Sequence, residues 1–178
     1  ALTQGHIDED LGVIKDWVDH VVNFSESEAM GISQVLESSD EPAPVTGVRA
    51  RLGYYDNWEN EVRVVSGRLP EYPPTATEGE TPVDMEVVLG LTVANELNLD
   101  VGAVLVLDQG MDQKGNTGKG HDSSRPITVF VSGIVSPVDE DASYWMEPSP
   151  LRLLDSKGGA GLWDHEFVFL TAQDAVYT

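Results

Sequence analysis

The sequence predicts an α+β domain built from mixed sheets and short helices, arranged as two small lobes. Apolar runs of strand length recur along the chain, and several alternate with polar residues, which is the period of a half-buried strand. Segments with helical spacing lie between them in irregular order, unlike the regular strand–helix alternation of a doubly wound sheet. The length of 178 residues suits one domain over 1–178, with lobes near 1–84 and 85–178.

The N-terminal segment predicts two helices. Apolar residues between 7 and 22 recur at steps of four, three, four and three, so they share one helix face. They are Ile7, Leu11, Ile14, Val18 and Val21. Ser25 and Glu28 have the spacing of a capping box, which predicts a second helix over 25–36, although Gly31 weakens it.

The next part of the chain predicts two strands around an aromatic turn. Residues 45–52 form the first strand, in which Arg49 and Arg51 alternate with apolar neighbours. Residues 53–58 carry a glycine, two tyrosines and a tryptophan, which indicates a turn rich in aromatic side chains. The second strand is predicted over 61–66.

The second half predicts four more strands, a short helix and two loops. The strands are expected at 85–89, 103–107, 127–135 and 166–170, and the helix at 91–99. Residues 71–84 are rich in proline and acids, which is typical of a surface loop. Residues 108–125 carry four glycines and almost no apolar side chain, which predicts a long hairpin loop. Thr171 is a candidate cap for a further helix.

Charge and composition exclude several kinds of function. The 31 acids and 10 bases give a net charge of −21, so nucleic acid would be repelled, because phosphate contacts need clustered Lys and Arg. The absence of cysteine excludes disulfides and thiolate chemistry. No stretch approaches the ~20 apolar residues that span a bilayer, so we expect membrane helices to be absent from this chain. The charge fits a solvated surface, a cation-attracting surface or adaptation to high salt.

Tests for common catalytic and cofactor-binding motifs fail. Gly118-Lys119-Gly120 resembles part of a phosphate loop, but Gln113 stands where the motif needs glycine and Gly120 where it needs Ser or Thr. No dinucleotide fingerprint and no Gly-x-Ser-x-Gly elbow occur. The four histidines do not pair at the spacing of a helical zinc site. We therefore expect no catalytic residue and no cofactor.

Two acidic segments are candidates for binding a cation. Asp108, Asp112 and Asp122 lie in the Gly-rich loop and supply the hard oxygen ligands that calcium prefers. The EF-hand order fails there, because Gln113 replaces the glycine and Lys119 the final glutamate. Asp139-Glu140-Asp141 is the other segment. For both, the alternative interpretation is a solvated loop.

Several motifs resemble, in order and spacing, those of MacB/FtsX-like permease ectodomains. The stretches are VVSGRLP at 64–70, MEVVLG at 85–90, VANELNL at 93–99, DVGAVLVL at 100–107, ITVFVSGIV at 127–135, DEDASYW at 139–145 and FVFLT at 167–171. The resemblance covers residues 60–178. Ala103 departs from it, since the family often has an acid there, and so does the long Gly-rich insertion between the two hairpin strands.

This resemblance implies a MacB-periplasmic-core-like fold and a domain without enzyme activity, on the extracytoplasmic side of a bacterial cell membrane. It implies that a separate cytoplasmic ATPase subunit hydrolyses ATP and that the membrane helices of the permease transmit movement to this domain. The substrate implied is a lipid, a peptide or a protein. The acidic composition agrees with this, because Lys and Arg concentrate on the cytoplasmic side of membrane proteins.

Aromatic residues are the candidates for contact with a partner. Exposed aromatic side chains dominate recognition surfaces, and the candidates are Tyr54, Tyr55, Trp58, Tyr144 and Trp145. The alternative role for these five is packing in a core or hinge.

Two other functions stay open at this point. A secreted acidic module that binds cations or glycans would account for the charge and for the loop at 108–125. A hydrolase that uses a pair of carboxyl groups is the third hypothesis, and it ranks last because pairs of acids are expected by chance in so acidic a chain.

Overall fold

The computed structural model describes residues 22, 24–35, 43–74, 83–108, 125–142, 144–145, 151, 154–155 and 165–176. The strands are β1 (Phe24–Glu26), β2 (Met30–Val35), β3 (Ala43–Tyr55), β4 (Val62–Gly67), β5 (Met85–Gly90), β6 (Val104–Asp108), β7 (Ile127–Pro137), β8 (Leu154–Asp155) and β9 (His165–Leu170). The helical elements are η3 (Trp58–Asn60), α2 (Leu91–Leu97) and α3 (Gln173–Val176).

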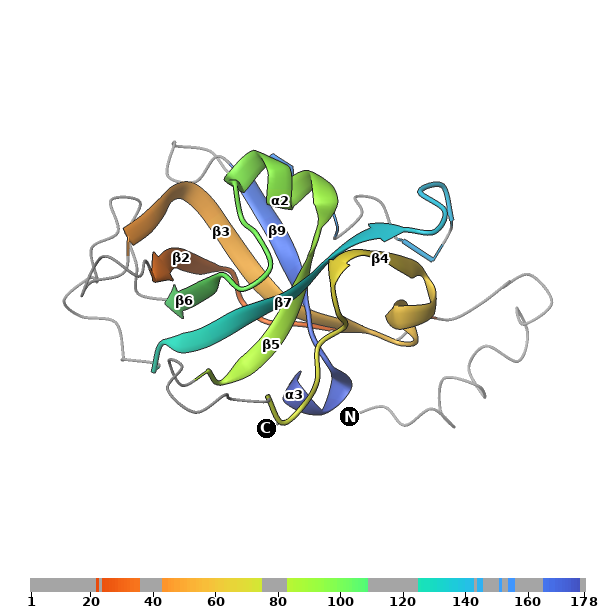
Figure 1. The fold of residues 1–178 in the computed structure, drawn as a ribbon, viewed down its shortest axis with the longest axis horizontal. Helices are drawn as coiled ribbons and strands as arrows, with labels where there is room; N and C mark the ends of the chain where they lie inside the picture. The colour runs from red at the N-terminus through yellow and green to blue at the C-terminus, as the bar shows by residue number, and fades with distance from the viewer. Residues whose placement is uncertain are drawn as a thin grey trace, which may run out of the picture.

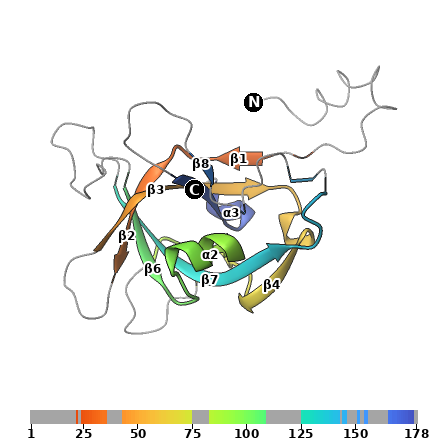
Figure 2. The same ribbon diagram turned by 90° about the horizontal axis from the view of Figure 1, so that it is seen from above.

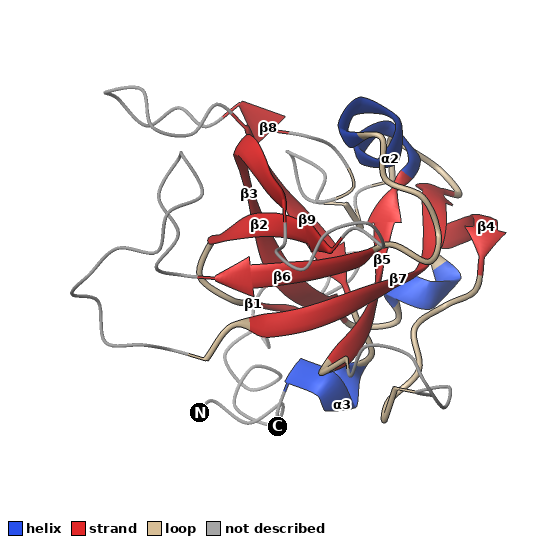
Figure 3. Cartoon of the chain, turned by 60° about the vertical axis from the view of Figure 1, so that its left-hand side comes forward, coloured by secondary structure: helices blue, strands red, loops and turns tan. Residues whose placement is uncertain are grey.

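The predicted fold class is wrong. The structure consists mostly of strands with few helices, and six strands close into a β-barrel (Figures 1 and 3). Around the barrel β3, β2, β6, β7, β5 and β9 pair in turn, and β9 returns to β3. The expected α+β, MacB-periplasmic-core-like arrangement of mixed sheets in two lobes is therefore replaced by one barrel, to which strands from both sides of residue 84 contribute.

The sequence did not predict the barrel, because a barrel closes through pairings between strands that lie far apart in the sequence. β3 runs parallel to β9, with Val48 opposite His165, and β5 runs parallel to β7, with Met85 opposite Val129. Local periodicity identifies a strand but does not name its neighbours. The strands predicted at 45–52, 61–66, 85–89, 103–107, 127–135 and 166–170 and the helix at 91–99 are confirmed, with shifted ends.

The helix predicted over 25–36 is also wrong. This segment forms β1 and β2, which both pair antiparallel with β3. Ser25, the predicted cap, instead lies in β1 opposite Tyr54. Ser27 lies between β1 and β2, and its hydroxyl accepts the N–H of Leu52 at 3.0 Å. Pairing with β3 and β6 outweighs the local capping pattern, as tertiary context often does. The helix predicted over 7–22 lies outside the described residues, apart from residue 22.

The interior of the barrel is an apolar core. Alternate residues of the barrel strands point inward, for example Val87 and Leu89 of β5 and Phe167 and Phe169 of β9. The rings of Phe167 and Phe169 meet edge to face, 4.8 Å apart. Val93 and Ala94 of α2 are buried in the same core. In Figure 2, α2 lies in front of the barrel strands.

A second apolar cluster lies outside the barrel wall. The alternate residues Val88 of β5 and Val168 and Leu170 of β9 point away from the interior and into this outer cluster. The other buried members are Tyr54, Tyr55, Trp58, Val62, Val135, Tyr144, Trp145 and Leu151. Strand β5 is therefore buried on both faces, which explains why its sequence is continuously apolar except for one acid.

Candidate functional site

The one acid of strand β5 forms a buried ion pair. Glu86 is 2% exposed, and both of its carboxylate oxygens accept hydrogen bonds from Arg68, at 2.5 Å from Nη1 and 2.7 Å from Nη2. The backbone N–H of Glu71 donates to the same carboxylate at 3.0 Å. This bidentate hydrogen bond and the charge of Glu86 raise the pKa of Arg68 above its usual value. The pair fastens the segment after β4 to the barrel wall.

Two glycines allow Arg68 to reach Glu86. Gly67 has φ +74°, a region that residues with a Cβ rarely adopt, and a Cβ there would lie 2.2 Å from the carbonyl oxygen of Ser132. A Cβ on Gly133 would lie 2.3 Å from the carbonyl oxygen of Arg68. The two backbones therefore touch, and the N–H of Arg68 donates to the Ser132 carbonyl at 2.9 Å.

Strand β5 is further tied to its neighbours by two buried hydroxyl groups. Ser132 of β7 donates to the carbonyl of Val87 at 3.2 Å. Thr171 donates to the carbonyl of Glu86 at 2.9 Å, so its side chain bridges to β5 instead of capping a helix. The segments 64–70, 85–90, 127–135 and 167–171 thus form one interlocked unit, which we call the clamp.

The five aromatic candidates gather in one place, where all are buried. Tyr54, Tyr55, Trp58, Tyr144 and Trp145 belong to the outer cluster. The indole N–H of Trp58 donates to the carbonyl of Thr171 at 3.3 Å, and the hydroxyl of Tyr144 donates to the carbonyl of Asp56 at 2.9 Å. Tyr144 and Trp145 pack edge to face with centroids 4.8 Å apart. The geometry of these five residues is that of a core, with no exposed face.

Burial raises the pKa of each of the three tyrosines in this group. Burial and the hydrogen bond to Glu26 raise the pKa of Tyr55. Burial and the charges of Glu61 and Glu59 raise the pKa of Tyr144. The pKa of Tyr54 is raised by burial and by Asp56. In each case the neutral phenol is the favoured form.

These shifts predict a delayed phenol titration and a loss of stability in alkali. The folded-state pKa of Tyr54, Tyr55 and Tyr144 lies above the ordinary value of 10.0, so their contribution to stability is present below pH ~10 and is lost as pH rises above it. Phenolate absorbance should rise later in the native chain than in the chain unfolded in urea. Superimposable titrations of the two forms would contradict this prediction.

The structure describes only some of the candidate cation ligands. Asp108 is buried at the end of β6, while Asp112 and Asp122 lie outside the described residues. Asp139 accepts the backbone N–H of Asp141 at 3.0 Å, which is a local turn contact. Within the described ranges, no three His, Asp or Glu side chains gather closely enough to hold a metal ion.

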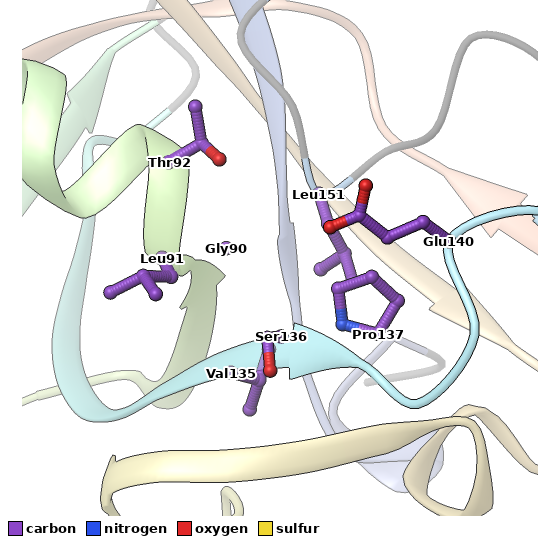
Figure 4. A pocket seen from close by; sticks show the side chains of 8 residues that line it. All are labelled: Gly90, Leu91, Thr92, Val135, Ser136, Pro137, Glu140 and Leu151. Carbon is purple, nitrogen blue, oxygen red and sulfur yellow. The ribbon is translucent and has the colours of Figure 1, made fainter.

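A small pocket lies beside the clamp, between the start of α2 and the end of β7 (Figure 4). Its volume is about 80 Å³, far below the roughly 300–1,000 Å³ of pockets that hold drug-sized ligands. It is lined by Gly90, Leu91, Thr92, Val135, Ser136, Pro137, Glu140 and Leu151. A Cβ on Gly90 would lie 2.0 Å from the carbonyl oxygen of Leu151, so the absence of a side chain lets these two segments meet.

The Arg68–Glu86 pair was not predicted, but the sequence carried a signal for it. Glu86 is a single acid within the apolar run at 85–90. A charge in a strand buried on both faces needs a partner, and Arg68 lies in the VVSGRLP motif at 64–70.

No family model, curated protein or solved structure matches the chain. The helices that the structure describes lack the length and hydropathy of a membrane span.

Proposed function

We propose that this chain is a non-catalytic extracytoplasmic domain of a bacterial ABC transporter permease. In this proposal it couples the binding of a substrate or partner outside the membrane to ATP hydrolysis by a separate cytoplasmic subunit. The observation that supports the proposal is the clamp: motifs that resemble those of permease ectodomains, far apart in the sequence, interlock through Arg68, Glu86 and Gly133.

The mechanical properties of the fold suit such a role. A domain that transmits movement must shift as a body, and close-packed interiors resist deformation. Here both faces of β5 are packed, one against the barrel core and one against the outer cluster. The ion pair Arg68–Glu86 adds a fixed connection between the barrel wall and the segment that follows β4. Movement of membrane helices attached to the domain would thus shift the barrel as a whole.

Two experiments test this proposal. The first reads the parent gene on both sides of the segment, where a permease would encode membrane helices before residue 1 and after residue 178. The second reconstitutes that full-length permease with its ATPase subunit in vesicles and replaces residues 1–178 by a Gly-Ser linker. We expect ATP hydrolysis to persist and transport to be lost.

Three results would contradict the proposal. One is a gene in which a signal peptide precedes this segment and a stop codon follows it directly. Another is unchanged transport by the linker variant. The third is a reaction catalysed by the isolated 178-residue chain that disappears when a single carboxylate is replaced by its amide.

A further inference from the structure

Strand β4 is an edge strand with an exposed apolar surface. It pairs with residues 133–137 of β7, and among the described strands it has no second neighbour. Figure 2 shows it at the rim of the molecule, beyond β7. Val64 is 39% exposed and Val65 is 49% exposed, and β4 is exposed after its first residue.

The backbone of β4 also presents hydrogen-bonding groups to the outside. The N–H of Val138 donates to the carbonyl of Glu61 at 2.9 Å, and Arg63 lies opposite Ser136. In an antiparallel ladder, alternate residues direct their N–H and C=O to the partner strand. The backbone N–H and C=O groups of Glu61 and Arg63 therefore point toward β7, and those of Val64 point away from it. Such an edge is a template for an added strand.

The register of β4 changes at its centre, next to these outward groups. Val64 lies opposite Val135 and Ser66 opposite Ile134, so Val65 has no partner residue on β7. A bulge of this kind leaves one residue unpaired and increases the local twist. Val64 and Val65, adjacent in sequence, are consequently both exposed on one short edge.

Negative charge collects at the N-terminal end of β4. Glu59, Asp139, Glu140 and Asp141 are exposed there, and Glu61 is half-exposed. The contact of Val138 with Glu61 brings the two acidic segments together, and Glu59 and Glu61 both act on the pKa of Tyr144. Within β4 itself the charged residue is Arg63. The edge is therefore apolar in its middle and acidic at one end.

We propose that the β4 edge binds an extended, basic-ended peptide segment of a partner protein as an added strand. Apolar side chains of that segment pack on Val64 and Val65, and its Lys or Arg residues lie against the acidic end. The net charge of −21 favours encounter with a basic segment and opposes self-association. This inference depends on β4 and its acidic end, and it stands whether or not the chain belongs to a permease.

The test uses isotope-labelled chain and a synthetic peptide, Thr-Val-Thr-Val-Thr-Val-Lys-Lys, together with its reverse sequence because the strand direction is open. We expect one of the two to shift the amide resonances of β4 and to protect the amide of Val64 from hydrogen exchange. The same peptides with Glu in place of Lys should bind about tenfold more weakly at low salt, since a rim charge contributes through steering and complementarity.

Variants separate the edge from the rest of the surface. Val64→Pro removes the outward N–H without removing a hydrogen bond to β7, and it should abolish peptide binding. Glu59→Lys with Asp141→Lys should reverse the preference between the Lys and Glu peptides. Glu28→Lys with Asp174→Lys changes the net charge by the same amount at exposed residues outside β4 and its acidic end, and it should leave that preference intact. The double charge variant keeps the test valid if Val64→Pro does not fold.

Three outcomes would overturn the inference. One is resonance shifts confined to elements other than β4. Another is equal binding of the Lys and Glu peptides. The third is concentration-dependent self-association of the wild-type chain that Val64→Pro abolishes, because the occupant of the edge would then be a second copy.

Discussion

Replacing Arg68 by alanine is expected to lower the free energy of unfolding by about 3 kcal/mol, because Glu86 would stay buried without its partner. The carboxylate of Glu86 is 2% exposed and relies on two hydrogen bonds from Arg68. The side chain of Arg68 is 42% exposed, so water screens part of the interaction, and we expect the loss at the lower end of the range for buried pairs. Urea unfolding of the two chains measures the difference.

A second substitution identifies the cause of that loss. Glu86→Gln removes the charge and keeps the shape, so the double variant Arg68→Ala/Glu86→Gln should recover about 1 kcal/mol relative to Arg68→Ala alone. A double variant no more stable than Arg68→Ala would show that the loss comes from the packing of the arginine stem and not from an uncompensated charge.

Replacing Trp58 by alanine is expected to lower the free energy of unfolding by about 4 kcal/mol, the usual cost of removing a fully buried large aromatic side chain. Trp58 is 0% exposed and lies in the outer cluster. Its indole N–H also donates to the carbonyl of Thr171 at 3.3 Å, so the substitution leaves that buried carbonyl without this donor. The midpoint of urea unfolding should fall accordingly.

Trp58→Phe is the matched control. It keeps most of the ring volume and loses the hydrogen bond, so we expect a loss of about 1 kcal/mol, clearly smaller than for alanine. If Trp58→Ala unfolded at nearly the wild-type urea concentration, the outer cluster would not be a core, and the five aromatic residues would again be candidates for partner contact.

Strand positions in this fold could be predicted from the sequence because their signals are local. The alternation of Arg49 and Arg51 with apolar residues marks the outer face of β3, where Arg51 pairs with Glu166 of β9 and donates to the carbonyl of Ser27 at 3.1 Å. The apolar run of β5 likewise predicts a buried strand. In such segments the residue pattern and the packing agree.

The closed barrel and the outer cluster could not be predicted in the same way. The outer cluster joins Trp58 to Tyr144 and Leu170, which lie far apart in the sequence, and nothing local specifies those contacts. The aromatic residues suggested a recognition surface because abundance of aromatic side chains is shared by interfaces and cores. The exposed edge of β4 could not be predicted either, because the exposure of Val64 depends on which strands lie beside β4.

The barrel can close only after β9 has been synthesised, because β9 lies between β3 and β5. Residues 165–170 pair with residues 48–53 on one side and contact β5 at Leu170 on the other. The barrel wall stays open until this late segment arrives, and pairings over so long a sequence separation are reached slowly, about milliseconds to seconds in small all-β proteins. During synthesis the ribosome therefore releases most of the chain before any closed wall can assemble, and the emerging polypeptide must remain unaggregated throughout that interval. The strong net negative charge, which makes the chain repel itself and its neighbours, protects it during this delay.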